Sequence, residues 1–225
     1  MTSIFRSVLG SEFERLHPAL QRRFSVGLDS GEACIGTGTM TKVWHAPWAR
    51  PFVTLGGTRN VLVAKTGQAI PFTIENVPYV DDFGRETVSF VRTFRFPDRP
   101  RRFDAQMVLA PSGRHIVDYL GTHQHLASDL HLSVDAAGGL VIRSGEHRLR
   151  ERAVDLRIPR LLAAEATVRE RYDDAGDCFR ISVSVAHPWF GRIFGYHGTF
   201  RTEYVDAAAL GLRAGLRPVR EESRM

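Results

Sequence analysis

The sequence predicts a mainly β protein: an antiparallel meander of about 10–11 strands that forms a barrel, half-barrel or sandwich behind a short N-terminal helical segment. Three observations predict it. Apolar residues have helical spacing only at the start of the chain, they alternate with polar residues from Ile35 onward, and glycine-containing turns recur at short intervals. About eleven strands are too many for a flat open sheet, so the sheet has to curl or close.

The helical segment is expected over residues 3–24. Its apolar residues follow a spacing of three and four, which is typical of one helix face: Phe5, Val8, Leu9, Phe13, Leu16, Leu20 and Phe24. Ser11 with Glu14 can cap a second helical turn, and Pro18 suits the first turn of another short helix. We expect a broken amphipathic helix that packs on the core, with a lid over a pocket as the alternative.

The strands are expected from residue 35 on. Four turns supply glycine for a positive φ angle, at 82–84, 111–113, 135–139 and 173–177. The strands between and around them are predicted at 36–44, 58–65, 70–81, 85–96, 103–110, 114–121, 129–134, 140–149, 166–172, 178–187 and 193–205. We interpret residues 1–205 as one barrel-like domain, and 206–225 as a short helix followed by a frayed, charged end.

The composition argues against several classes of protein. The net charge is +5 and the pI is about 9.7, but the positive charge is mostly arginine, spread along the chain and interleaved with acids, so we expect no nucleic-acid partner. No stretch approaches the length of apolar chain that spans a membrane, and the N-terminus lacks the pattern of a secretion signal. We therefore expect a cytoplasmic protein with no membrane span. Cys34 and Cys178 are far apart and are expected to be small buried side chains.

Charged residues interrupt the apolar faces of several predicted strands. Arg92 shares a face with Val88, Phe90, Phe94 and Phe96. By the same alternation Glu170 lies with Val168 and Tyr172, Asp118 with Ile116 and Leu120, and Asn76 with Ile74. An isolated buried charge is costly, so we predict that Arg92 pairs with Asp118 or Glu170 inside the sheet. The alternatives are a surface face with exposed aromatic residues, or a structural ion pair without a ligand.

A histidine-rich segment follows Asp118. On an extended strand His123 and His125 project to the same side, and Asp129 or His131 can join them, which is the raw material of an acid–base pair or a metal site. Histidines at the end of a strand are the more ordinary interpretation, so we assign neither a metal nor a cofactor. No nucleophile motif of the G-x-S-x-G type and no phosphate-binding loop occurs.

Several ordered blocks of sequence resemble the bacterial family DUF4166, a domain of unknown function. They are residues 16–24, 71–94, 101–105, 116–130, 139–150 and 194–200, with sequences such as IVDYLGTHQHLASDL and FGYHGTF. The family has no settled activity, so the resemblance implies no catalytic residues. Its members occur alone or fused to other domains, including ones that resemble NAD(P)-binding dehydrogenases, which implies association with an oxidoreductase domain as one role.

Two further functions follow from the residues themselves. The first is binding of a small apolar or amphipathic molecule, by the side chains Arg92, Asn76, Phe90, Phe94, Tyr172, His125 and Tyr196. The second is a cofactor-independent enzyme of the isomerase, cyclase or hydrolase type. In it Asp118, His123 or Glu170 acts as acid or base, and Arg92 stabilises negative charge. The sequence leaves open the identity of the ligand, the oligomeric state and whether any reaction is catalysed.

Overall fold

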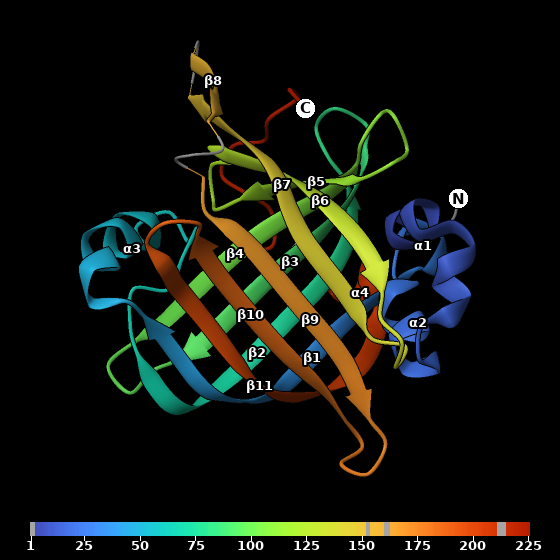
Figure 1. The fold of residues 1–225 in the computed structure, drawn as a ribbon. Helices are drawn as coiled ribbons and strands as arrows, with labels where there is room; N and C mark the ends of the chain where they lie inside the picture. Colours follow the sequence, from blue (N-terminus) through green and yellow to red (C-terminus); the bar gives the residue numbers. More distant parts are fainter. Residues whose placement is uncertain (1–2, 152–153, 160–162, 211–214) are drawn as a thin grey trace.

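Ten strands of the computed structural model close into an antiparallel barrel (Figure 1). The structure describes residues 3–151, 154–159, 163–210 and 215–225. Neighbouring strands of the barrel follow one another in sequence, and β1 pairs with β11 to close it. The barrel strands are β1 Glu32–His45, β2 Gly67–Val80, β3 Glu86–Arg95, β4 Pro100–Leu109, β5 Ile116–Leu120, β6 Leu126–Val134, β7 Leu140–Glu151, β9 Glu165–Asp173, β10 Cys178–His187 and β11 Gly191–Asp206. The predicted antiparallel meander is confirmed. Of the three predicted forms, which were a barrel, a half-barrel and a sandwich, the structure is the barrel.

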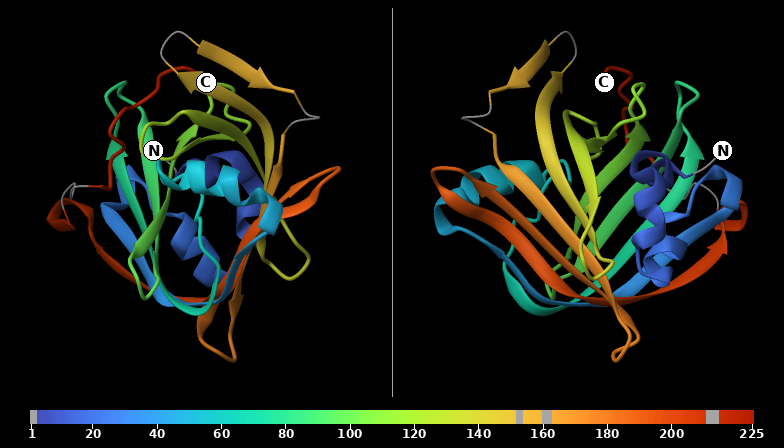
Figure 2. Two further views of the ribbon diagram at one scale, coloured as in Figure 1. Left: turned by 90° about the vertical axis from the view of Figure 1, so that its left-hand side faces the viewer. Right: turned by 45° about the vertical axis from the view of Figure 1, so that its right-hand side comes forward.

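Two features of the barrel differ from a uniform ladder. The short strand β8, Val154–Ile158, pairs only with β7 and projects from the barrel as part of a hairpin (Figure 2). It was not predicted, although its sequence VDLRI alternates apolar and polar residues, because no glycine or proline marks a turn between it and the preceding strand. Between Ser128 and Leu130 the register of β6 against β7 shifts, which is a β-bulge. This bulge reverses the direction in which the following β7 side chains point.

The N-terminal helical segment closes one end of the barrel. It consists of α1 Ile4–Leu9, the 3-10 turn η1 Gly10–Arg15 and α2 Pro18–Phe24. All but one of the apolar residues predicted for its stripe are buried in the main core, and Val8 packs partly buried against it. The Phe5 ring lies 4.7 Å from Phe24 and 5.9 Å from Phe90 of β3, so the helices pack into the barrel end as core. The predicted core packing is confirmed.

Residues 58–65, which were predicted as a strand, follow a helix at the other end of the barrel. The helix α3, Arg50–Gly57, follows the short turn η3, Pro47–Ala49, and residues 58–65 form no strand. The prediction of a strand at 58–65 is wrong, because hydrogen bonds from other parts of the chain fix the conformation of this segment. The backbone N–H groups of Asp104 and Thr122 donate to the carbonyls of Asn60 and Arg59, so the segment is tied to β4 and to the β5–β6 turn.

The C-terminal residues lie along the outside of the barrel. After α4, Ala207–Leu210, the described part of the tail accepts hydrogen bonds from outward-facing strand residues. Ser89 Oγ donates to the Leu216 carbonyl at 2.7 Å, and Tyr119 Oη donates to the Arg224 carbonyl at 2.7 Å. The predicted frayed end is therefore wrong for residues 215–225, because the tail satisfies buried polar groups of β3 and β5. Cys34 and Cys178 are buried and free, as predicted. No helix among the described residues is long and apolar enough to cross a membrane.

Candidate functional site

The barrel holds an interior cavity of about 230 Å³. It lies between the end of α2 at one side and the 58–66 segment after α3 at the other, and these helices stand at opposite sides in Figure 1. Its wall is mostly apolar, with contributions from Phe24, Leu62, Ile74, Phe90, Phe103, Met107, Leu130, Ile142, Val168, Ile181, Val183 and Tyr196. A smaller set of polar side chains also faces it: Arg23, Arg92, Asp118, Ser128, Ser144, His147 and Glu170. An apolar cavity with a few convergent polar groups is the usual form of a small-molecule site.

Arg23 and Glu170 form a fully buried ion pair at the edge of the cavity. Arg23 comes from the last turn of α2, and its Nε donates to Glu170 Oε1 of β9 at 2.5 Å. Its Nη1 donates to Asn76 Oδ1 at 2.5 Å and contacts Cys34 Sγ at 3.3 Å. Burial opposes the charge of Arg23, but Glu170 and Cys34 outweigh it and the pKa of Arg23 is raised. This group fastens α2 to the barrel interior.

Arg92 is buried on β3 without comparable partners. Its guanidinium carbon lies 4.8 Å from the Phe103 ring centre and 5.6 Å from that of Phe90, so aromatic faces cover it. Its Nε and Nη1 have no hydrogen-bond partner among the described residues. The predicted pairing of Arg92 with Glu170 is wrong, because Arg23 from α2 takes that carboxylate. The side chain of Arg92 is 7% exposed and lines the cavity, so it is a buried cation that faces open space.

Asp118 of β5 faces the same cavity as Arg92. Burial raises the pKa of the Asp118 carboxyl to about 7, although the positive charge of Arg92 lowers it. Its Oδ1 has no hydrogen-bond partner among the described residues. Arg92 therefore acts on Asp118 through its charge, and no hydrogen bond joins it to Oδ1. A carboxyl group with a pKa near neutrality can donate or accept a proton at pH 7.

Asp118 belongs to a row of side chains that crosses four strands. In the register of the sheet Met107 lies opposite Asp118, Asp118 opposite Ser128, and Ser128 opposite His147. Ser128 Oγ and His147 Nδ1 are 2.6 Å apart. Burial lowers the pKa of His147, so its imidazole is neutral at pH 7. The row places a titratable carboxyl, a hydroxyl and a neutral imidazole on one wall of the cavity.

Four polar residues of the site were not predicted: Arg23, Ser128, Ser144 and His147. Strict alternation along β7 places His147 outside, because it puts Ser144 and Glu146 on the inner face; the bulge beside Gly145 turns His147 inward. A Cβ at Gly145 would lie 2.7 Å from His131 Nε2, so this position suits glycine. Ser128 follows the alternation of β6 and could have been found from it. Arg23 carries no signal in the sequence, since a basic pair near the end of a helix usually faces solvent.

Five of the predicted site residues lie away from the cavity. Asn76 binds Arg23, and Phe94 packs in the core between Phe72 and Tyr196, with both ring centres 5.1 Å away. Tyr172 lies against the Phe179 ring, 5.0 Å away, beyond the Arg23 cluster. His123 and His125 stack on each other at 5.4 Å in the β5–β6 connection, where Arg220 of the tail donates to the His123 carbonyl. The structure thus brings together Arg92, Asp118, Glu170, Phe90 and Tyr196 and leaves these five outside.

The histidine-rich segment gathers no metal-binding group. Asp129 binds Arg148 through both carboxylate oxygens, at 2.7 and 3.0 Å. The ring of His115, just before β5, lies 6.0 Å from the ring of His131 on β6. Within the described residues no group of three or more histidine, cysteine, aspartate or glutamate side chains is arranged to hold a metal ion.

Comparisons with known proteins cover the whole of this site. A family model described as "Domain of unknown function (DUF4166)" matches residues 16–200, which include Arg23, the cavity wall and the row on β4–β7. A protein of Bacillus subtilis (strain 168), "Uncharacterized protein YndH", is 32% identical over 205 residues, covering 90% of this chain and 98% of that protein. Neither description names an activity.

Proposed function

Because the chain belongs to the DUF4166 family, whose description names no activity, we propose from the cavity itself that the barrel binds a mostly apolar small molecule whose polar end lies at Arg92. One observation carries this proposal: the buried guanidinium of Arg92, two of whose nitrogens have no hydrogen-bond partner among the described residues, faces a mostly apolar cavity. A volume of about 230 Å³ is slightly below the usual range of about 300–1,000 Å³ for ligand pockets, so the molecule is small.

The unpartnered nitrogens indicate the chemistry of the polar end. Leaving a charged donor buried and unpaired costs free energy that a well-packed core avoids. A ligand oxygen, above all that of a carboxylate, would supply the missing acceptor and pair with the charge of Arg92. Asp118 in its protonated form can donate a second hydrogen bond to the same group, because burial raises its pKa to about 7. The geometry therefore favours an amphipathic molecule with an anionic or strongly accepting end.

Native mass spectrometry and calorimetry test this proposal. A small molecule that purifies with the protein should survive gentle ionisation and be lost on unfolding. For direct binding, octanoate and octan-1-ol form a matched pair of probes that differ in the polar end. We expect octanoate to bind more tightly, and Arg92→Leu to weaken octanoate by at least about tenfold while leaving octan-1-ol unchanged. The surface variant Arg114→Leu is the control.

Two results would speak against the proposal. If neither probe binds and no molecule co-purifies, the cavity has no ligand of this class. If both probes bind equally to the wild type and to Arg92→Leu, the cavity is apolar in function and Arg92 does not anchor the ligand.

A second candidate function is a cofactor-independent enzyme of the isomerase, cyclase or hydrolase type. The specific observation in its favour is the position of Asp118, with a raised pKa, next to the Ser128–His147 pair on one cavity wall. Asp118 is the acid or base in this proposal, and Arg92 stabilises the negative charge that develops on the substrate. Any co-purified molecule should be incubated with wild type and with Asp118→Asn. Product formed by the wild type alone supports an enzyme, and identical spectra exclude turnover of that molecule.

A further inference from the structure

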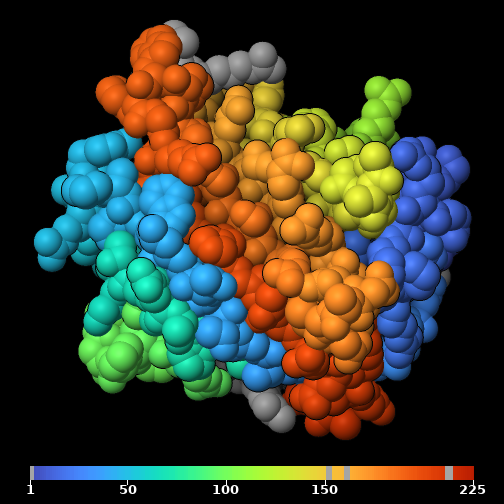
Figure 3. Space-filling model, turned by 60° about the horizontal axis from the view of Figure 1, so that its bottom comes forward, coloured from blue at the N-terminus to red at the C-terminus, as the bar shows by residue number. Residues whose placement is uncertain are grey.

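Five large apolar side chains are exposed together at the α3 end of the barrel. We call them the α3 patch: Trp48, Phe52, Leu55, Trp189 and Phe190, which are 47%, 69%, 72%, 67% and 64% exposed. They come from two segments that are far apart in sequence, the η3–α3 region and the β10–β11 turn. The rings of Trp48 and Phe190 are 5.7 Å apart, so the segments form one surface. Figure 3 shows the two segments next to each other, in light blue and orange. Such a group of exposed aromatic side chains indicates an interaction surface.

The helix α3 is amphipathic and lies over the cavity. Its Val53 is fully buried, while Phe52 and Leu55 lie three residues apart and are both exposed. A Cβ at Gly56, near the end of α3, would lie 3.6 Å from Leu62, and Leu62 lines the cavity. The patch is therefore the outer surface of the segment that covers one end of the cavity.

Three segments at the α3 end carry mostly positive charge. The segments 42–66, 95–102 and 187–192 hold four, four and one of the lysine and arginine residues, and one acid, Asp98. Asp98 is already paired with Lys65 and Arg101, at 2.6 and 2.8 Å. Since the whole chain has a net charge of +5, the rest of it is net negative. The positive charge is thus concentrated in these three segments, two of which also hold the exposed apolar side chains.

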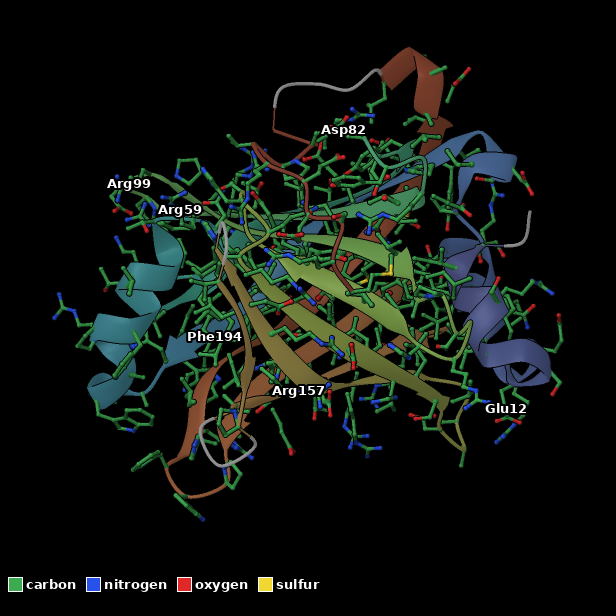
Figure 4. All side chains as sticks on the ribbon, turned by 90° about the horizontal axis from the view of Figure 1, so that it is seen from above. Glu12, Arg59, Asp82, Arg99, Arg157 and Phe194 are labelled. Carbon is green, nitrogen blue, oxygen red and sulfur yellow. The ribbon has the colours of Figure 1, made fainter. Side chains whose placement is uncertain are left out.

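Several of these cations have no acidic partner. Arg50, Arg59 and Arg192 are exposed and form no ion pair among the described residues. Figure 4 labels Arg59 and Arg99 on the side of the molecule where α3 lies. Glu165, at the start of β9 opposite Ala186, is a further acid on the strand next to the β10–β11 turn. A surface of this kind combines apolar contacts with attraction to anions.

We infer that the α3 patch docks on the surface of an anionic lipid bilayer. An amphipathic helix with aromatic residues on one face and cations around it binds at the boundary between headgroups and acyl chains. Tryptophan is favoured at that boundary, and each cation near an anionic membrane adds attraction. The surrounding positive charge selects a lipid surface over a second copy of this chain, whose α3 end would carry the same charge. The inference is independent of which molecule the cavity holds.

Vesicle flotation tests the inference with the full chain. The protein is mixed with vesicles of pure phosphatidylcholine, and with vesicles of equal parts phosphatidylcholine and phosphatidylglycerol. We expect it to float with the anionic vesicles and to be released by high salt. Two of the three tryptophans, Trp48 and Trp189, belong to the patch, so their fluorescence should shift to shorter wavelength on binding and be quenched by brominated lipid. Protein that stays at the bottom with both kinds of vesicle overturns the inference.

Paired variants distinguish vesicle binding through the α3 patch from nonspecific adsorption of the protein to lipid. Phe52→Ser with Leu55→Ser should weaken binding by at least about tenfold, because both side chains are exposed in the free protein and buried in the bilayer. The control is Val80→Ser with Phe83→Ser, which removes two side chains that are 48% and 49% exposed near the opposite end. Arg50→Glu with Arg192→Glu should weaken binding to anionic vesicles by at least about tenfold, against Arg114→Glu with Arg171→Glu as a control of equal charge.

Two further results would overturn the inference. One is equal binding by the α3 variant and its control, which would place the contact elsewhere on the protein. The other is a concentration-dependent dimer of the wild type, measured by analytical ultracentrifugation and lost in the Phe52→Ser, Leu55→Ser variant. That dimer would show that a second copy covers the patch.

Discussion

Arg23 and Arg92 are both buried in the interior of one barrel, but only Arg23 has an acidic partner in direct contact. Arg23 is 2% exposed and binds Glu170 and Asn76 through short hydrogen bonds, and Nη2 is its only nitrogen without a partner among the described residues. Arg92 is 7% exposed and is covered by two aromatic rings, and its Nε and Nη1 have no hydrogen-bond partner in the part of the chain that the structure describes. A charge buried at a cost and left unpaired is not explained by the stability of the fold. The contrast separates a structural arginine from one that is available to a ligand.

The largest expected effect comes from breaking the structural pair. Arg23→Met leaves the Glu170 carboxylate buried without its partner, and we expect the free energy of unfolding to fall by about 3–5 kcal/mol. Urea denaturation at pH 7 measures this change. The double variant Arg23→Met, Glu170→Met removes both charges and should recover much of the loss. A single variant within about 1 kcal/mol of the wild type would show that the pair contributes little to holding α2 in place.

A second expected effect concerns the titration of Asp118 next to Arg92. Burial raises the pKa of Asp118 to about 7, whereas an aspartate in the unfolded chain has a pKa of about 3.9. The folded state therefore binds more protons than the unfolded state between these values, so this group's contribution to stability is full below about pH 4 and is lost as the pH rises to about 7. We therefore compare the free energy of unfolding of Asp118→Asn with that of the wild type. The difference in favour of the variant should grow by about 2–3 kcal/mol between pH 5 and pH 8.

Urea denaturation of the two proteins at pH 5, 6, 7 and 8 measures this difference. Asp104→Asn is a poor control, because Asp104 binds Arg102 and Asn60 directly. Glu203→Gln serves better, because Glu203 is exposed and forms no ion pair among the described residues. If the difference in the free energy of unfolding between Asp118→Asn and the wild type does not change with pH, the pKa of Asp118 is not raised in the folded state. That result would also contradict the distinction between the paired charge of Arg23 and the charges of Arg92 and Asp118.

The same two arginines show how far the sequence predicts this site. Alternation along β3, β5 and β9 correctly places Arg92, Asp118 and Glu170 on the inner face, because a strand has a fixed period of two. It does not predict which charges pair. Glu170 meets Arg23, 147 positions away, because α2 enters the end of the barrel, and no local pattern records that approach.

Some secondary-structure elements also follow from local sequence signals, and others depend on distant contacts. The helical stripe before residue 24 and the glycine turns are local signals, and they correctly predict the N-terminal helices and ten of the strands. The run Val61–Ala64 has the composition of a strand, but the contacts that fix residues 59–60 come from β4 and from the β5–β6 turn. His147 was missed for a third reason, since the bulge in β7 breaks the period on which the prediction rests.

The smallest change in stability is expected from removing the charge of Arg92. Arg92→Leu removes a buried charge that has unpartnered nitrogens and replaces it with an apolar side chain among Phe90, Phe103 and Ile74. We expect the unliganded protein to be unchanged or more stable, by about 1–2 kcal/mol, because no partner is left unsatisfied at pH 6, where most of Asp118 is protonated. Urea denaturation at pH 6 measures the stability, and calorimetry with octanoate measures the binding that the variant should lose. A destabilisation as large as that of Arg23→Met would mean that Arg92 holds the barrel together, and its unpartnered nitrogens would then give no argument for a ligand.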